Sequence, residues 1–142
     1  MNHVPIVIEQ SFQTSVHSVW EAITDAEQMR QWFFPQIERF VPEVGFETQF
    51  NVNAEGRDFL HVWKVTEVVP QRRLVYQWRY DGYPGDSMVV WDLSSIDRQA
   101  LLKFTHEGHE TIGGDPMFTR ENCEAGWNFL IKQSLVDFLS KN

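Results

Sequence analysis

The chain has 142 residues, of which 42% are hydrophobic and 23% charged, a composition typical of globular domains and not of disordered or membrane-spanning chains. Its formal net charge of -8 opposes approach to DNA, RNA and anionic membranes, and Arg72-Arg73 is the longest basic cluster, so we expect no nucleic-acid partner. The single cysteine, Cys123, excludes an internal disulfide, and residues 1–12 resemble neither a membrane span nor a signal peptide, so we expect a cytoplasmic location.

The first predicted elements are a strand and two short helices. Residues 4–13 are apolar and β-branched, as a strand requires. Ser15 is a suitable cap for a first helix, whose apolar residues recur at helical spacing: Val16, Val19, Trp20 and Ile23. Asp25 and Gln28 form a capping-box pattern that predicts a second helix, and Pro35 ends it.

From about residue 37 to 107 the sequence predicts strands separated by turns. The run LVYQWRY at 74–80 alternates, with one apolar face formed by Leu74, Tyr76, Trp78 and Tyr80. The run LLKFTH at 101–106 likewise places Leu102, Phe104 and His106 on one face. Such alternation favours an antiparallel sheet with one buried and one solvated face. In the strand at 58–69 the predicted inward residues are Phe59, His61, Trp63 and Val65, with Val62 and Val68 on the opposite face.

The C-terminal segment is predicted to be one long amphipathic helix. Asp115 or Thr119 is its expected cap, and Pro116 suits a first turn. Its apolar stripe contains Cys123, Trp127, Leu130, Ile131, Ser134, Leu135 and Phe138. The element order predicts an α+β fold of one domain over residues 1–142. In this fold a curved antiparallel sheet wraps around the long C-terminal helix, and two short helices follow the first strand.

Several segments together resemble a known family. They are SVHSVWEAITDAEQMRQWF at 15–33, EVVPQRRLVYQW at 67–78, LLKFTHEG at 101–108 and GWNFLIKQSLVDFL at 126–139. This ordered set is similar to the Hsp90-ATPase-activator-homologue branch of the START-like, or helix-grip, superfamily. The resemblance implies a helix-grip fold with an internal cavity, in a superfamily associated with binding apolar molecules. Some relatives are cyclases or oxygenase subunits, and the branch is named for an Hsp90 co-chaperone domain.

Two positions depart from the family pattern. Gly45-Phe46 stands where the family often has two glycines, and Trp63 aligns with a position that is often glycine. An indole in place of a hydrogen predicts a cavity that is narrower or filled by protein. The alternative to a cavity is therefore an aromatic core, since buried aromatic residues stabilise a fold without any ligand.

The leading hypothesis is non-catalytic binding of a small hydrophobic or aromatic molecule between the sheet and the C-terminal helix. No cofactor and no catalytic residue are predicted. The expected ligand-binding residues combine the inward aromatic set with His106 and one aliphatic residue of the last helix: Trp32, Phe34, Trp63, Tyr76, Trp78, Trp91, Phe104, His106, Trp127 and Ile131.

Other functions stay open at this point. A cavity-based cyclase, dehydratase or hydrolase would use His106, His61 and Tyr76 as acid–base groups. A protein-binding module would contact a chaperone of the Hsp90 type. The His106–His109 pair has the wrong spacing for a helical zinc motif and is better explained by a turn at Gly108, so no metal is expected. Cys123 is expected to pack as a small hydrophobic residue.

Overall fold

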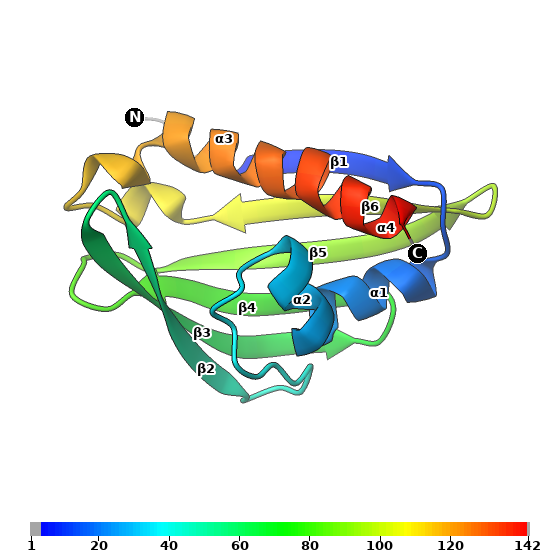
Figure 1. The fold of residues 1–142 in the computed structure, drawn as a ribbon, viewed down its shortest axis with the longest axis horizontal. Coiled ribbons are helices and arrows are strands. Elements are labelled where there is room, and N and C mark those ends of the chain that lie inside the picture. Colours follow the sequence, from blue (N-terminus) through cyan, green and yellow to red (C-terminus); the bar gives the residue numbers. More distant parts are fainter. Residues whose placement is uncertain (1–3, 142) are drawn as a thin grey trace.

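In a computed structural model, which describes residues 4–141, the strands form one fully antiparallel sheet in the order β1-β6-β5-β4-β3-β2 (Figure 1). The strands are β1 Ile6–Phe12, β2 Glu47–Ala54, β3 Arg57–Val69, β4 Arg73–Tyr80, β5 Ser87–Ile96 and β6 Gln99–Glu107. The helices are α1 Val16–Thr24, α2 Ala26–Trp32, α3 Arg120–Phe129 and α4 Val136–Ser140, with a π-helical segment Leu130–Leu135 between the last two. Short 3₁₀ turns span His109–Thr111 and Pro116–Phe118.

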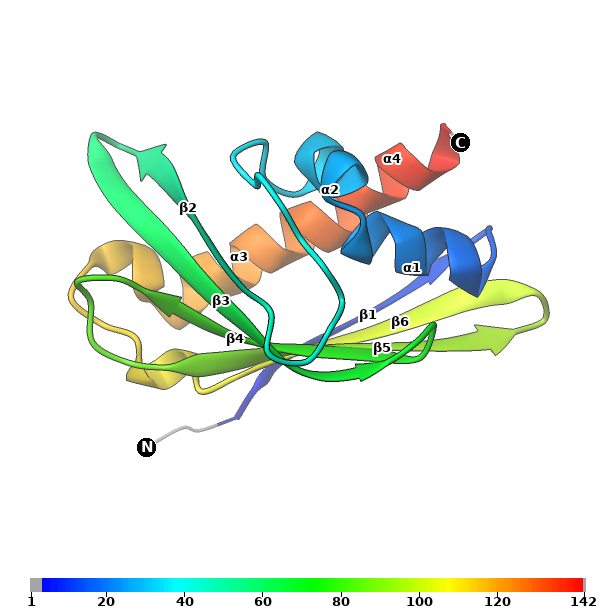
Figure 2. The same ribbon diagram turned by 90° about the horizontal axis from the view of Figure 1, so that it is seen from below.

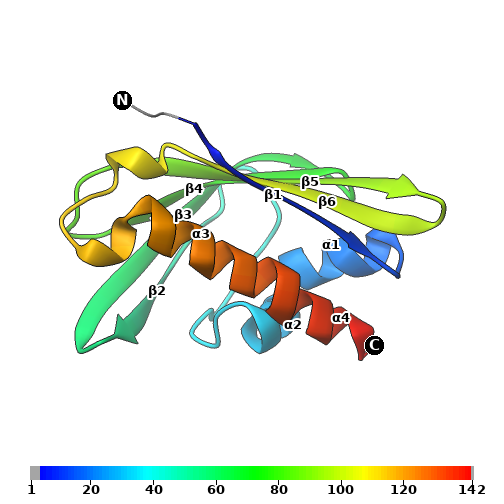
Figure 3. The ribbon, with the colours of Figure 1, turned by 90° about the horizontal axis from the view of Figure 1, so that it is seen from above.

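All of the helices lie on one face of the sheet (Figures 2 and 3). The long helix formed by α3, the π-helical segment and α4 crosses this face, and the β2–β3 hairpin curves towards it (Figure 2). This arrangement is the predicted α+β helix-grip fold. Among residues 4–141, no helix combines the length and the hydropathy that crossing a bilayer requires.

The predicted alternation of the strands is confirmed, with one correction in β3. Tyr76, Phe104 and their inward neighbours are buried against the helices. In β3 the register with β4 shifts between Val65 and Glu67, so that Val68 pairs with Leu74 and packs on the core. The prediction that Val68 faces away from the core was therefore wrong, because a bulge inserts one residue and reverses the faces beyond it.

The helix caps follow the sequence with one exception. The Ser15 side chain accepts a hydrogen bond from the amide of Ser18, as predicted. Asp25 precedes α2, but its side chain makes no cap bond, so the expected capping box does not form. Both predicted C-terminal caps are used. The Asp115 side chain caps the 3₁₀ turn at Pro116, and the Thr119 side chain caps α3. The run of strands that follows α2 begins at Glu47 and not near residue 37.

The π-helical segment determines which residues of the C-terminal helix are buried. The most deeply buried residues, Trp127, Ile131, Leu135 and Leu139, recur every fourth position. In a regular α-helix each four-residue step rotates by about 40° beyond a full turn, so such a stripe drifts away from the sheet. The wider π-helical turn reverses this drift. Leu139 therefore becomes buried and Phe138 only partly buried, whereas the sequence stripe included Phe138 and omitted Leu139.

Candidate functional site

The inward face of the sheet carries a layer of aromatic rings that fills most of the interior. Trp63 is 1% exposed and lies within ring contact of Phe33, Phe50, Tyr76 and Trp78 at centroid distances of 4.7–5.6 Å. A glycine at position 63 would leave this volume empty, so the indole occupies space beneath β3 and β4. Aromatic clusters of this density stabilise a core through buried area and edge-to-face contacts.

One part of this face remains hollow. A pocket of about 260 Å³, open to solvent, lies between β3, β4 and β6 of the sheet and the helix face that runs along α3 from Asn122 to Leu130 at the start of the π-helical segment. Most of its wall is apolar or aromatic, and the described residues that line it include no Asp, Glu, Lys or Arg. The lining residues are Phe34, His61, Trp78, Tyr80, His106, Met117, Asn122, Cys123, Gly126, Trp127, Phe129 and Leu130.

The structure brings only part of the predicted site to this pocket. Of the ten predicted residues, Phe34, Trp78, His106 and Trp127 line it. The others are buried in the surrounding core: Trp32, Trp63, Tyr76, Trp91, Phe104 and Ile131. Sequence reasoning placed Tyr80 and His61 on the inward face but did not include them in the site. It missed the helix residues Asn122, Gly126, Phe129 and Leu130, although their spacing of three and four marks one helix face.

Hydrogen bonds on both ring nitrogens hold His106 in one tautomer. The indole Nε1 of Trp127 is only a donor, and it donates to His106 Nδ1 across 3.1 Å. The proton of the neutral ring is therefore on Nε2, which lies 2.9 Å from the Ser87 hydroxyl oxygen. The Ser87 hydroxyl in turn donates to the Trp78 carbonyl oxygen across 2.6 Å. Burial, assisted by the nearby His109, lowers the pKa of His106 to about 3, so the ring is neutral at pH 7.

His61 differs from His106 because one of its ring nitrogens has no hydrogen-bond partner. His61 Nδ1 lies 2.9 Å from the carbonyl oxygen of Phe59, so Nδ1 carries the proton and donates. Burial lowers the pKa of His61 to about 4, and Nε2 is then an unprotonated acceptor. Among residues 4–141, nothing donates to this nitrogen. The ring lies among Phe34, Phe50 and Tyr80 at centroid distances of 4.7–5.1 Å.

Tyr76, the third acid–base candidate, and the single cysteine are in less favourable positions for chemistry. Tyr76 is fully buried and outside the pocket lining, and its hydroxyl accepts a hydrogen bond from Trp91 Nε1. Burial raises its pKa far above the ordinary value. Cys123 reaches the pocket, but burial raises the pKa of its thiol, which disfavours the reactive thiolate.

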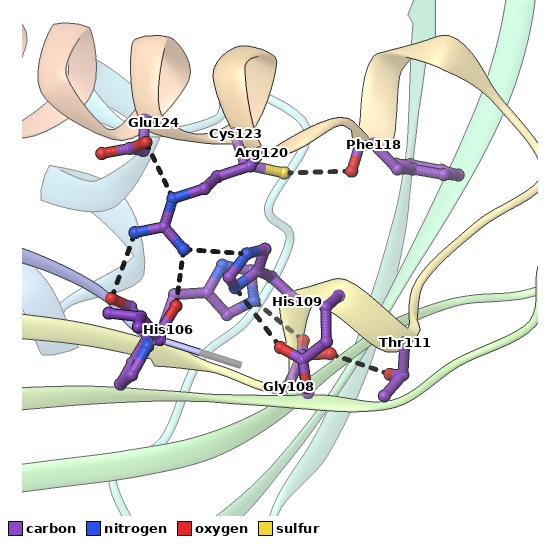
Figure 4. A network of polar contacts seen from close by, with 12 residues as sticks. His106, Gly108, His109, Thr111, Phe118, Arg120, Cys123 and Glu124 are labelled. Atoms are coloured by element: carbon purple, nitrogen blue, oxygen red, sulfur yellow. Dashed lines mark hydrogen bonds and ion pairs between the residues drawn. The ribbon is translucent and has the colours of Figure 1, made fainter. Parts of the chain in front are cut away.

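His109, the other member of the His106–His109 pair, lies beside Arg120, which attaches α3 to the segment before β1. Gly108 has a positive φ of 82° and starts the turn that carries His109 (Figure 4). The Arg120 guanidinium donates to the carbonyl oxygens of Val4 and Pro5, contacts His109 Nε2 at 3.4 Å and pairs with Glu124 (Figure 4). In the described part of the chain, no three His, Cys, Asp or Glu side chains are grouped so that they could hold a metal ion.

The chain belongs to the family described as Activator of Hsp90 ATPase homolog 1-like proteins, whose family model matches residues 13–140. This agrees with the resemblance in the sequence. No match was found among curated proteins.

Solved structures show the same fold at low sequence identity. The protein CV1439 from Chromobacterium violaceum is 23% identical with a TM-score of 0.81, and the match covers 97% of this chain and 98% of that one. An Hsp90 activator from Plasmodium falciparum is 17% identical with a TM-score of 0.72, covering 96% of each chain. DynU16, a protein from the dynemicin biosynthetic locus, is 23% identical with a TM-score of 0.77 over 99% of this chain. This chain spans about half of DynU16, 48% of its length.

Proposed function

We propose that this protein binds a small, uncharged aromatic molecule in the pocket beneath α3 without converting it chemically. The observation that carries the proposal is an open, largely aromatic pocket with no charged side chain among its described lining residues. Apolar pockets with a few oriented polar groups are the usual form of small-molecule sites. A charged ligand would lose its hydration there without gaining an ionic partner.

The volume of the pocket limits the size of the ligand. A dry protein cavity of about 150 Å³ accommodates benzene. The pocket here, at about 260 Å³, is larger by less than a factor of two. Two fused aromatic rings are therefore the appropriate size, and the indoles of Trp78 and Trp127 offer surfaces on which such rings can pack.

The state of the titratable groups favours binding over acid–base catalysis. A general base needs a free lone pair within reach of the substrate and a pKa near the working pH. His106 has both nitrogens engaged, and Tyr76 does not line the pocket. His61 keeps a free lone pair, but its pKa of about 4 makes it a weak base suited to accepting a hydrogen bond.

A chaperone contact receives less support from the surface. In the described part of the chain, the exposed large apolar residues on helices and strands are Val7 of β1, Val69 of β3, Ile96 of β5 and Phe129 of α3, one on each element, and Val4 and Val44 lie outside the elements. Apolar residues scattered in this way are normal for a protein surface. They do not define a docking patch.

A substitution that fills the pocket tests the proposal. Gly126 lines the pocket, and a Cβ added there would meet nothing within 4 Å. A helical side chain at this position leans towards the preceding turn, where Asn122 and Cys123 also line the pocket. Gly126→Phe should therefore place its ring in the pocket. Ala125→Phe is the matched control, because Ala125 is exposed on the same helix and does not line the pocket.

The measurement is isothermal titration calorimetry with naphthalene-sized probes, 2-naphthol and 2-methylnaphthalene. We expect binding to the wild-type protein and to Ala125→Phe, and loss of binding in Gly126→Phe. Equal binding to both variants would place the ligand elsewhere. Absence of binding to the wild-type protein would contradict the proposal for ligands of this size.

A further inference from the structure

Two neighbouring residues of the pocket wall have unused hydrogen-bonding capacity of opposite kinds. His61 and Tyr80 are paired across β3 and β4, and their rings lie 4.7 Å apart at the centroids. Both side chains line the pocket. His61 is 5% exposed as a residue, but Nε2 is not among the fully buried atoms without a partner, so solvent in the open pocket still reaches it. A ligand that displaces this solvent has to supply a donor, because an acceptor buried without a partner is costly.

The Tyr80 hydroxyl supplies the complementary donor. Its oxygen accepts a hydrogen bond from Trp78 Nε1 across 2.9 Å, which leaves its own proton free to donate. No hydrogen bond from this hydroxyl to another described residue is present. Burial raises the pKa of Tyr80 well above its ordinary value, so the proton stays on the oxygen. The pair therefore presents one acceptor and one donor side by side.

The ring nitrogens of the other tryptophan and histidine residues that line the pocket are already engaged. Trp127 Nε1 donates to His106, and His106 Nε2 donates to Ser87. Trp78 Nε1 donates to Tyr80. The Asn122 amide nitrogen, at the rim on α3, donates to the Pro116 carbonyl oxygen. His61 and Tyr80 are thus the groups of the sheet wall that remain free to orient a ligand.

We propose that the ligand carries a hydroxyl group on its aromatic ring, which donates to His61 Nε2 and accepts from the Tyr80 hydroxyl. A hydroxyl is the smallest neutral group that combines a donor and an acceptor on one atom. Its fit to this pair singles out phenols and naphthols among uncharged aromatic molecules. The inference rests on the proposed binding function and specifies its ligand class.

A pair of nearly isosteric probes tests this inference separately from the binding function. In 2-methylnaphthalene a methyl group replaces the hydroxyl of 2-naphthol at similar size, so the two compounds differ mainly in hydrogen bonding. Calorimetry with the wild-type protein should give binding about tenfold tighter for 2-naphthol, the scale expected for hydrogen bonds that satisfy buried groups.

Substitutions should remove this preference without removing binding. His61→Phe and Tyr80→Phe keep an aromatic ring at each position and delete the acceptor or the hydroxyl. Each should weaken 2-naphthol binding about tenfold and leave 2-methylnaphthalene binding within about twofold. Tyr83→Phe is the control, since Tyr83 stacks on Phe59 and does not line the pocket. It should bind both probes as the wild-type protein does.

The outcomes distinguish the two proposals. Equal affinity of the wild-type protein for both probes, or an unchanged preference in both variants, would overturn hydroxyl recognition while the binding function stands. Failure of both probes to bind would contradict the binding function and the inference that depends on it. Circular dichroism and thermal unfolding of each variant identify any loss of folding. If one variant does not fold, the other still decides the result.

Discussion

Trp127 on α3 donates its indole proton to Nδ1 of His106 on β6 across 3.1 Å, and this bond joins the C-terminal helix to the sheet at the wall of the pocket. Both side chains are at most 5% exposed. Because an indole only donates, the bond fixes the histidine tautomer. It also satisfies two polar groups that would otherwise be buried without partners.

Trp127→Phe should leave His106 Nδ1 without its donor. We expect a loss of about 1–3 kcal/mol in the free energy of unfolding from the unpaired acceptor, in addition to the lost ring area. Urea denaturation measures the loss, and nitrogen NMR of the histidine rings should show unprotonated Nδ1 at His106 in the wild-type protein. The control is Trp20→Phe, because the Trp20 side chain is also buried but makes no hydrogen bond to the described residues. A protonated Nδ1 at His106 would contradict the assignment.

Acid should destabilise the fold through its two neutral histidines. The folded-state pKa is about 3 for His106 and about 4 for His61, both below the ordinary value of 6.5. Between these values the unfolded chain binds more protons, so stability is present above pH 6.5 and falls as the pH decreases. From pH 6.5 to 5, each histidine should remove about 1.5 kcal/mol from the free energy of unfolding, because the unfolded histidine is already half protonated at pH 6.5.

The variant His61→Phe separates the two contributions to this pH dependence. It should have about half of the wild-type slope over the same interval, because one titrating group remains. Urea denaturation at several pH values measures both slopes. Unfolding free energies that are constant between pH 6.5 and 5 would contradict the neutral, buried state of the histidines.

Two buried tryptophans should differ in their tolerance of phenylalanine. Trp63 and Trp91 are both at most 1% exposed, but Trp63 Nε1 has no hydrogen-bond partner among the described residues, whereas Trp91 Nε1 donates to the Tyr76 hydroxyl. Trp63→Phe removes an unsatisfied donor, and Trp91→Phe breaks a hydrogen bond. Trp63→Phe should therefore cost less unfolding free energy, by about 1–3 kcal/mol. Equal losses in thermal or urea denaturation would argue against this difference.

Two glycines should respond in opposite ways to alanine. At Gly126, within α3, an added Cβ meets nothing within 4 Å, so Gly126→Ala should stabilise the protein by about 0.5–1 kcal/mol through helix propensity. Gly108 has a positive φ of 82°, and an added Cβ would lie 2.9 Å from the Asp86 carbonyl oxygen. Gly108→Ala should therefore destabilise the protein. The comparison requires only unfolding curves, and a stabilising Gly108→Ala would refute the turn geometry.

The fold could be predicted from the sequence because its periodicities are strong and local. Alternation marked the inward residues of β4 and β6, and Ser15 and Thr119 marked two helix starts. Two errors arose where the backbone changes its repeat. The bulge near Glu67 reversed the faces of β3, and the π-helical segment added Leu139 to the buried stripe, where Phe138 packs only partly buried. Neither irregularity has a residue signature, so regular repeats were extended through them.

The candidate site was harder to predict than the fold. The sequence shows that Trp63 and Trp91 face inwards, but it does not show which inward rings touch each other and which border a hollow. Whether an inward ring contacts another ring or lines the pocket depends on the distance between α3 and the sheet. That distance is set by the packing of all the side chains in the interior. The free acceptor on His61 was also invisible, because it follows from the single hydrogen bond to the Phe59 carbonyl oxygen.

The most direct test of the central claim is an NMR titration of the indole resonances with 2-naphthol. The chain has six tryptophans, and two of them, Trp78 and Trp127, line the pocket. Binding in the pocket predicts large, saturable shifts of the Nε1 resonances of Trp78 and Trp127. The resonances of Trp20, Trp32, Trp63 and Trp91 should move much less. Shifts centred on those four, or no shift at saturating probe, would contradict a ligand site beneath α3.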